Sequence, residues 1–256
     1  MSAAFDRLAT DYDAAFTRTD LGSRLRRAVW KRLDALFTPG DSILELACGT
    51  GEDAVHLGGR GLRVLATDAS PEMVRVAREK VERAGLFETV EVRQLAVEEL
   101  DVLDAPPFDG ALSDFGGLNC VADLPAASRA LAARLRPGAV VVLCVMGPLV
   151  PWEWGWFLGH GQPGRAFRRL TSGGVEWRGL RVRYPSIRAL RRAFAPGFRM
   201  RRVAALGAFL PPPYAEGWAV RHPDLTDRLE RWERRLETVP PLPWLADHYL
   251  LELERQ

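Results

Sequence analysis

The chain has 256 residues, of which 47% are hydrophobic and 27% charged, and these proportions exclude a disordered, collagen-like or coiled-coil protein. The longest apolar run, residues 139–146, is shorter than the ~18–20 residues of a membrane-spanning helix, and Asp6 is unlike a secretory signal. Cys48, Cys120 and Cys144 are too few for a disulfide framework and too far apart for a zinc site. We therefore expect a cytoplasmic protein with reduced thiols, no membrane span and no metal.

The net charge of +2 is distributed unevenly along the chain. Residues 1–164 sum to −6, residues 165–202 to +11 and residues 203–256 to −3. The middle segment holds 12 arginines and one acid, so it could meet a phosphate, a carboxylate, a nucleic acid or a membrane surface. A solvated arginine-rich face is favoured instead, because Lys31 and Lys80 are the only lysines and arginine is this chain's usual cation.

Strands and helices are predicted to alternate through the first part of the chain. Apolar residues at helical spacing indicate the first helix, and Ser70 followed by Pro71 supplies the N-cap and first-turn proline of another. We expect strands at residues 42–46, 63–68, 90–95, 110–113 and 140–146, and helices at residues 22–37, 52–57, 71–83 and 125–135. Such alternation is typical of a parallel sheet covered by helices on both faces.

The alternation stops after residue 146. A segment rich in proline, glycine and tryptophan follows, with no predicted helix or strand. We then expect a helix at 187–194, a strand at 200–206, a helix at 225–236 and a strand at 249–253. Five strands before the break and two after it favour one domain over two.

A glycine-rich turn joins the first strand to its helix. Residues 44–51 read LELACGTG, and this stretch resembles the nucleotide-binding loop of class I S-adenosylmethionine-dependent methyltransferases, small-molecule branch. Asp68, Met73 and Tyr12-Asp13 stand at matching places, so the resemblance covers residues 5–146. It implies an α/β, doubly wound, mostly parallel seven-stranded sheet with an antiparallel last strand and a lid inserted after the fifth strand.

The resemblance implies S-adenosylmethionine as the cofactor and assigns its contacts. Glycines at 49 and 51 let the backbone turn sharply beside a ligand, and the first amides of the next helix favour a negative group there. Glu45 would face the ammonium group, Asp68 the ribose hydroxyls and Met73 the adenine. The expected cofactor-binding residues are Glu45, Ala47, Gly49, Thr50, Gly51, Asp68, Ala69, Met73, Ala96, Val97, Asp114 and Phe115.

Two positions depart from the family pattern. Ala47 replaces the first glycine of the loop, which is a tolerated change. Most relatives place an acid just after the third strand to hold the adenine amino group, whereas residues 95–99 read LAVEE here. Either the main chain of Ala96 and Val97 recognises adenine, or Glu98 reaches back to it.

Two other classes of function compete with this interpretation. Residues 49–54 satisfy G-x-G-x-x-A, which would suit an NAD(P)-dependent oxidoreductase, but the chain offers no second mononucleotide-binding half and that class leaves Glu45 unexplained. A non-catalytic or nucleic-acid-binding relative would instead use the arginine-rich residues 165–202.

The substrate is expected at the carboxyl ends of the parallel strands, over residues 113–120 and from residue 147 onward. The aromatic residues of segment 147–164 either form their own small core or cover an apolar substrate as a lid. Candidate catalytic residues are His248 as a general base, beside Asp247, and Tyr12 and Asn119 as walls of the acceptor site.

The expected organisation is a single domain of four parts. Residues 1–40 form a helical cap, residues 41–146 the cofactor-binding core, residues 147–197 a lid, and residues 198–256 a terminal strand-helix-strand. We predict methyl transfer to a small acceptor that is apolar or aromatic, with an anionic acceptor left open. No nucleic-acid partner is expected, and the oligomeric state stays undecided.

Overall fold

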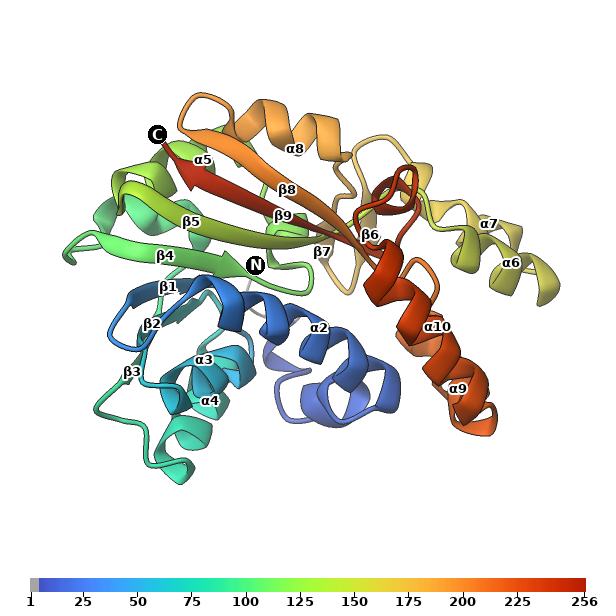
Figure 1. Cartoon of the computed structure of the whole chain (residues 1–256), viewed down its shortest axis with the longest axis horizontal. Helices are drawn as coiled ribbons and strands as arrows, with labels where there is room; N and C mark the ends of the chain where they lie inside the picture. Colours follow the sequence, from blue (N-terminus) through green and yellow to red (C-terminus); the bar gives the residue numbers. More distant parts are fainter. Residues whose placement is uncertain (1–4) are drawn as a thin grey trace.

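A computed structural model describes residues 5–256 and shows one twisted seven-stranded sheet with helices on both faces (Figure 1). Residues 1–4, which belong to the predicted cap and to the segment compared with a secretory signal, lie outside the described residues. The strand order is β3-β2-β1-β4-β5-β9-β8. The strands are β1 (Ser42–Leu46), β2 (Arg63–Asp68), β3 (Val90–Gln94), β4 (Phe108–Ser113), β5 (Leu135–Met146), β8 (Phe198–Leu206) and β9 (His248–Arg255).

The first five strands run parallel, while β9 lies antiparallel between β5 and β8. This arrangement confirms the predicted doubly wound sheet, its antiparallel last strand and the segment inserted after the fifth strand. The helices of eight residues or more are α2 (Asp20–Leu36), α3 (Glu52–Gly59), α4 (Pro71–Arg83), α5 (Leu124–Ala133), α6 (Pro151–Gly159), α8 (Ile187–Phe194) and α10 (Pro223–Leu236).

Successive strand residues supply two separate cores, as the period of two in a β-strand requires. In β1, Ile43 packs toward α2, α3 and α4, whereas Leu44 packs toward α5 and α8. In β4 the same alternation sends Leu112 to the first core and Ala111 to the second. Both faces are therefore covered, which explains why the central strands read as continuous apolar runs.

The start of α2 is held by its own cap and by a carboxylate from later in the chain. Thr19 caps α2 by accepting a hydrogen bond from the Gly22 amide at 3.0 Å. The carboxylate of Glu216, in α9 (Glu216–Arg221), accepts from the amides of Asp20 and Leu21 at 2.6 and 3.0 Å. Negative charge at a helix N-terminus is stabilising, so α2 has two acceptors at its start.

The segment after β5 is more regular than its sequence predicts. Pro151 begins α6, because a proline suits the first turn of a helix, and α7 (Pro163–Ala166) follows it. A short antiparallel hairpin of β6 (Val175–Trp177) and β7 (Leu180–Val182) comes next, turning through Arg178 and Gly179 with φ of 51° and 83°. Two residues with positive φ fit the tight turn that matches strand twist.

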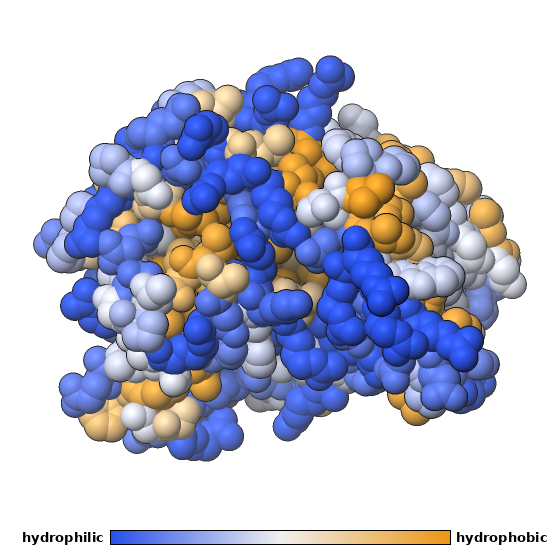
Figure 2. Space-filling view, viewed as in Figure 1, coloured by the Kyte–Doolittle hydropathy of each residue, from blue (hydrophilic) through white to orange (hydrophobic). Residues whose placement is uncertain are grey.

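The arginines of residues 165–202 are divided among several elements. Arg169 is buried and paired with Asp247. Arg199 and Arg202 form ion pairs with glutamates of β9. The arginines of α8 are exposed. Figure 2 shows hydrophilic side chains over most of the face in view, with apolar groups scattered between them. Within residues 5–256, no helix is long and apolar enough to cross a membrane.

Candidate functional site

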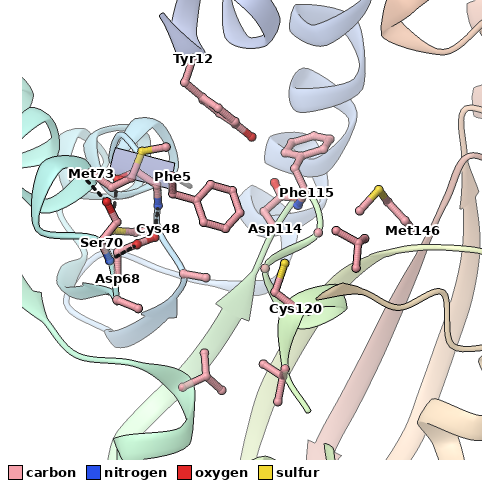
Figure 3. Close-up of a pocket in the computed structure, with 18 of the residues that line it drawn as sticks. Phe5, Tyr12, Cys48, Asp68, Ser70, Met73, Asp114, Phe115, Cys120 and Met146 are labelled. Carbon is pink, nitrogen blue, oxygen red and sulfur yellow. Dashed lines mark hydrogen bonds between the residues drawn. The ribbon is translucent and has the colours of Figure 1, made fainter. Parts of the chain in front are cut away.

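A deep cavity opens at the carboxyl ends of the parallel strands (Figure 3). Its volume is about 360 Å³, within the ~300–1,000 Å³ of typical ligand pockets. One half is lined by the loops after β1, β2 and β3, and the other half by the loop after β4, Met146 and residues of the inserted segment. The two kinds of wall suit two ligands side by side.

The glycine-rich turn is shaped by left-handed backbone at three positions. Ala47, Gly49 and Gly51 have φ of 54°, 55° and 75°. A Cβ at Gly51 would lie 2.9 Å from the Cβ of Ala77, so only glycine fits between this turn and α4. Gly51 also begins α3, whose free amides therefore face the turn, as the sequence predicts.

Asp68 links the first two loops of this half. Its carboxylate accepts from the Gly49 amide at 2.9 Å and from the Ser70 amide at 2.8 Å. Burial raises its pKa, and the two amide hydrogen bonds oppose that rise. Ser70 in turn caps α4 by accepting from the Met73 amide at 3.1 Å, which sets the Met73 side chain against the cavity.

The N-terminal segment closes over the glycine-rich turn. Thr50 donates to Asp13 at 2.6 Å, and the Lys80 ammonium lies 2.7 Å from both Asp13 and Glu52. Burial would raise the pKa of Asp13, but its hydrogen bonds to Lys80 and Thr50 outweigh burial and lower it. Tyr12, next to Asp13, lines the cavity, and burial raises its pKa to about 12, so it stays a neutral phenol at neutral pH.

A group of buried carboxyl groups lies beneath the cavity. Burial and the neighbouring Asp53 raise the pKa of Asp114 to about 7, and the same two causes raise that of Glu45 well above its usual range. Arg26 of α2 is hydrogen-bonded to Asp53, and its guanidinium lies 4.8 Å from the centre of the Phe115 ring. One oxygen of Glu45 is buried without a protein partner among the described residues. This region would stabilise a cationic ligand.

The predicted cofactor residues mostly meet at this cavity. It is lined by Ala47, Gly49, Thr50, Asp68, Ala69, Met73, Val97, Asp114 and Phe115. Glu45 lies buried beneath it, next to the turn. Gly51 and Ala96 are not in the lining. The Ala96 amide donates to Glu99 at 3.1 Å, whereas Glu98 does line the cavity.

The three predicted catalytic residues occupy different environments. Tyr12 faces the cavity. Asn119 is fully buried and outside the lining; its amide donates to the carbonyls of Met146 and Arg183 at 3.1 and 2.6 Å and accepts from the Met146 amide at 3.0 Å. Those contacts join the loop after β4 to the end of β5 and to the inserted segment.

His248 lies one side chain away from the cavity. Its ring contacts the Phe115 ring edge-on with centres 5.6 Å apart, and Phe115 itself lines the cavity. Nδ1 of His248 lies 3.0 Å from the Asp247 carboxylate, as the sequence predicts for these neighbours. Arg169 also binds Asp247 at 2.5 Å, and the charges of Arg169 and His248 outweigh burial and lower the pKa of Asp247.

The inserted segment contributes other residues than its sequence suggests. The tryptophans of α6 are not in the cavity lining; Trp152 donates to the Phe209 carbonyl at 2.9 Å, and Phe157 packs on Tyr214. The cavity is instead lined by Arg168, Trp177 and Tyr184 of this segment, and by Phe5, Arg26 and Met146, none of which the sequence singled out. Cys120 of the predicted 113–120 loop also lines it. Arg26 was detectable, since it lies on the apolar face of α2 beside Leu25 and Val29.

Comparison with known proteins identifies the central part of the chain. Residues 43–138 match the sequence profile of a methyltransferase domain family. The part of the chain that holds the glycine-rich turn therefore belongs to a methyltransferase domain family. A similar curated relative is the malonyl-[acyl-carrier protein] O-methyltransferase of Serratia marcescens, 33% identical over 153 residues, or 57% of this chain and 52% of that protein.

Other relatives share the same region. The demethylmenaquinone methyltransferase of Clavibacter sepedonicus is 31% identical over 157 residues, covering 59% of this chain and 60% of that protein. The chain thus spans about half to three-fifths of the length of these curated relatives. A crystal structure described as a putative S-adenosylmethionine-dependent methyltransferase from Listeria monocytogenes shares the fold, with a TM-score of 0.61, 17% identity, and coverage of 89% and 96% of the two chains.

Proposed function

We propose that this protein transfers a methyl group from S-adenosylmethionine to a small-molecule acceptor. The observation that carries the proposal is the continuity of one cavity from the glycine-rich turn to the inserted segment, since methyl transfer needs both ligands in one water-poor space. The acceptor is apolar or aromatic, because valines, methionine and tryptophan dominate the second half of the lining. A single domain with residues 147–197 as its lid and a cytoplasmic location belong to the same proposal.

The residues of the first half fit the cofactor. The turn at Gly49 leaves room for a ligand against the backbone, and Asp68 presents a carboxylate at the place where ribose hydroxyls bind in doubly wound sheets. Met73 and Val97 would flank the adenine, with Glu98 near its amino group. The unpartnered oxygen of Glu45 would take the ammonium group.

The protein's own contribution is positioning and exclusion of water. When bound, the cofactor supplies a methyl group on a positively charged sulfur, which needs a nucleophile in line behind it at ~3–3.5 Å. The aromatic rings of Phe5, Tyr12, Phe115 and Trp177 narrow the space where the acceptor atom would lie. Asp114 and Glu45 would stabilise the positive charge from below.

His248 remains our candidate for removing a proton from the acceptor. Asp247 lies 3.0 Å from Nδ1, so Nε2 is the ring nitrogen left to accept the proton. Phe115 stands between the ring and the cavity, so a water molecule or a shift of Phe115 would have to connect them. Tyr12 would serve as a wall or hydrogen-bond donor, and Asn119 would position the acceptor loop.

The deciding experiment measures cofactor binding and product together, because this fold alone does not prove the reaction. Calorimetry with S-adenosylhomocysteine should show binding that Asp68→Ala weakens by at least 10-fold. Incubation with cofactor labelled at the methyl group and a metabolite extract should then label a small molecule. Absence of binding at hundreds of micromolar, or binding of NADH in its place, overturns the proposal.

A further inference from the structure

The acceptor half of the cavity has apolar walls and one cationic side chain. Its lining beyond the cofactor loops comprises Cys120, Val121, Met146, Val175, Trp177, Val182, Tyr184 and Arg168. Among the described lining residues, Asp114 is the one acid on the loop after β4, whereas Glu52, Asp53, Asp68 and Glu98 belong to the cofactor half. A guanidinium in such surroundings is weakly hydrated and favours a charged partner.

Arg168 is paired with a carboxylate on the side away from the cavity. Its Nε lies 2.6 Å from one oxygen of Glu153, which is fully buried in α6. The other Glu153 oxygen lies 2.5 Å from Nε of Arg169, and Arg169 also binds Asp247. The guanidinium groups of Arg168 and Arg169 therefore share the Glu153 carboxylate. Of the two, Arg169 also has a second carboxylate partner, Asp247.

The outer part of the Arg168 guanidinium lacks a protein partner. Within residues 5–256, the ion pair of its Nε with Glu153 is the only polar contact of this guanidinium, and its two terminal nitrogens have none. These two nitrogens are the parallel donors with which arginine binds both oxygens of a carboxylate. Because the ion pair with Glu153 restrains the Nε end of the side chain, less conformational entropy would be lost when the outer edge binds.

The few cationic side chains in the cavity lining favour a ligand with a single negative charge. The only other cation in the described lining is Arg26, which is already hydrogen-bonded to Asp53. A phosphate or diphosphate would need several donors or cations, whereas a single carboxylate matches one guanidinium edge. Trp177 and Tyr184 provide aromatic surface in the same half for the rest of such a molecule.

We propose that the acceptor carries one carboxylate on an apolar or aromatic body and that Arg168 anchors it through its terminal nitrogens. This inference rests on the proposed methyl transfer and names the substrate class for that same cavity. Arg168 is then a specificity-determining residue, whereas Glu153 and Arg169 act through it as positioning residues.

The test compares carboxylic acids with amides of the same shape. Protein loaded with S-adenosylhomocysteine is titrated by calorimetry with 4-hydroxybenzoate, indole-3-acetate and decanoate, and with the primary amide of each. We expect at least one acid to bind about 10- to 100-fold more tightly than its amide, the range for a charge-assisted hydrogen-bond pair. Arg168→Gln should remove that preference, and Arg168→Lys should keep part of it.

Arg165→Gln is the matched control, because Arg165 is exposed on α7 of the same segment and does not line the cavity. It should keep the full preference for acids, and all three variants should bind S-adenosylhomocysteine like the parent. If no acid binds, if acid and amide bind equally, or if Arg168→Gln keeps the preference, the inference is overturned. Failure of the parent protein to bind S-adenosylhomocysteine overturns the proposed function and this inference with it.

Discussion

Gly117 faces the methyl group of Ala47 across the cavity floor: a Cβ at position 117 would lie 2.6 Å from the Cβ of Ala47. Ala47 replaces a glycine of the family's loop and keeps its left-handed backbone, with φ of 54°. Because Gly117 has no side chain, there is room for the methyl group of Ala47. The two positions are coupled although 70 residues separate them in the chain.

This contact predicts a specific double-mutant result. Gly117→Ala should destabilise the protein by about 1–3 kcal/mol, because the added methyl group is closer than packing allows. Ala47→Gly should remove most of that loss, and alone it should change stability little, since relief of left-handed strain offsets the greater freedom of glycine in the unfolded chain. Urea unfolding of the four proteins measures the coupling, and strictly additive effects would contradict the contact.

Lys80 is predicted to fasten the N-terminal segment over the cofactor loop. Lys80→Met removes the ammonium that pairs with Asp13 and Glu52, so the Tyr12–Asp13 stretch should loosen and S-adenosylhomocysteine affinity should fall by about 10-fold, or ~1.4 kcal/mol. Calorimetry measures the affinity, and hydrogen exchange of residues 5–18 reports the loosening. Lys31→Met is the natural control because Lys31 is exposed on α2, and equal behaviour of the two variants would refute the role of Lys80.

The raised pKa of Asp114 predicts a pH-dependent stability. Its pKa is 3.8 in the reference state and about 7 in the folded protein, so between about pH 4 and 7 the folded protein retains a proton that the unfolded chain has released. The unfolded state then binds fewer protons, and the free energy of unfolding falls as pH rises through this window. Urea unfolding should show that the free energy of unfolding falls more between pH 5 and pH 8 for the parent protein than for Asp114→Asn. Equal falls would show that Asp114 is ionised throughout.

His248 is predicted to matter for turnover and not for cofactor binding. His248→Ala should lower turnover by about 10²-fold or more, the low end for general acid–base catalysis, while S-adenosylhomocysteine binds as before. His222→Ala is a control because His222 is exposed after α9, with Nδ1 2.8 Å from the Trp218 carbonyl. Full turnover in a folded His248→Ala protein would leave a mechanism of positioning alone.

The sequence predicts those parts of the molecule whose signals are local. The turn at residues 47–51 and the Ser70 cap lie in short segments whose backbone demands particular residues, and both appear at the predicted places. The hairpin β6–β7 was missed because its strands have three residues each and its turn uses Arg178, which is not a usual left-handed residue.

The roles of individual polar side chains depend on tertiary contacts that no local pattern reveals. Asn119 follows β4 as expected, but its amide is engaged by two carbonyls, one of them 64 residues further along the chain. His248 stands at the predicted sheet edge, yet the ring of Phe115 determines how it meets the cavity. Arg168 was counted as one of 12 arginines, and its place in the cavity wall, beside buried Glu153, distinguishes it from the others.

The position of β9 has a consequence for how the protein is made. β8 precedes β9 in the chain, but in the sheet β9 lies inside it and pairs with both β5 and β8. While the ribosome is still adding residues 248–255, the edge of β5 has no partner, and β8 cannot join the sheet. Unpaired strand edges invite pairing with other chains. A nascent chain stalled before residue 248 should therefore be a substrate for chaperones. Addition of β9 then joins β8 to the rest of the sheet.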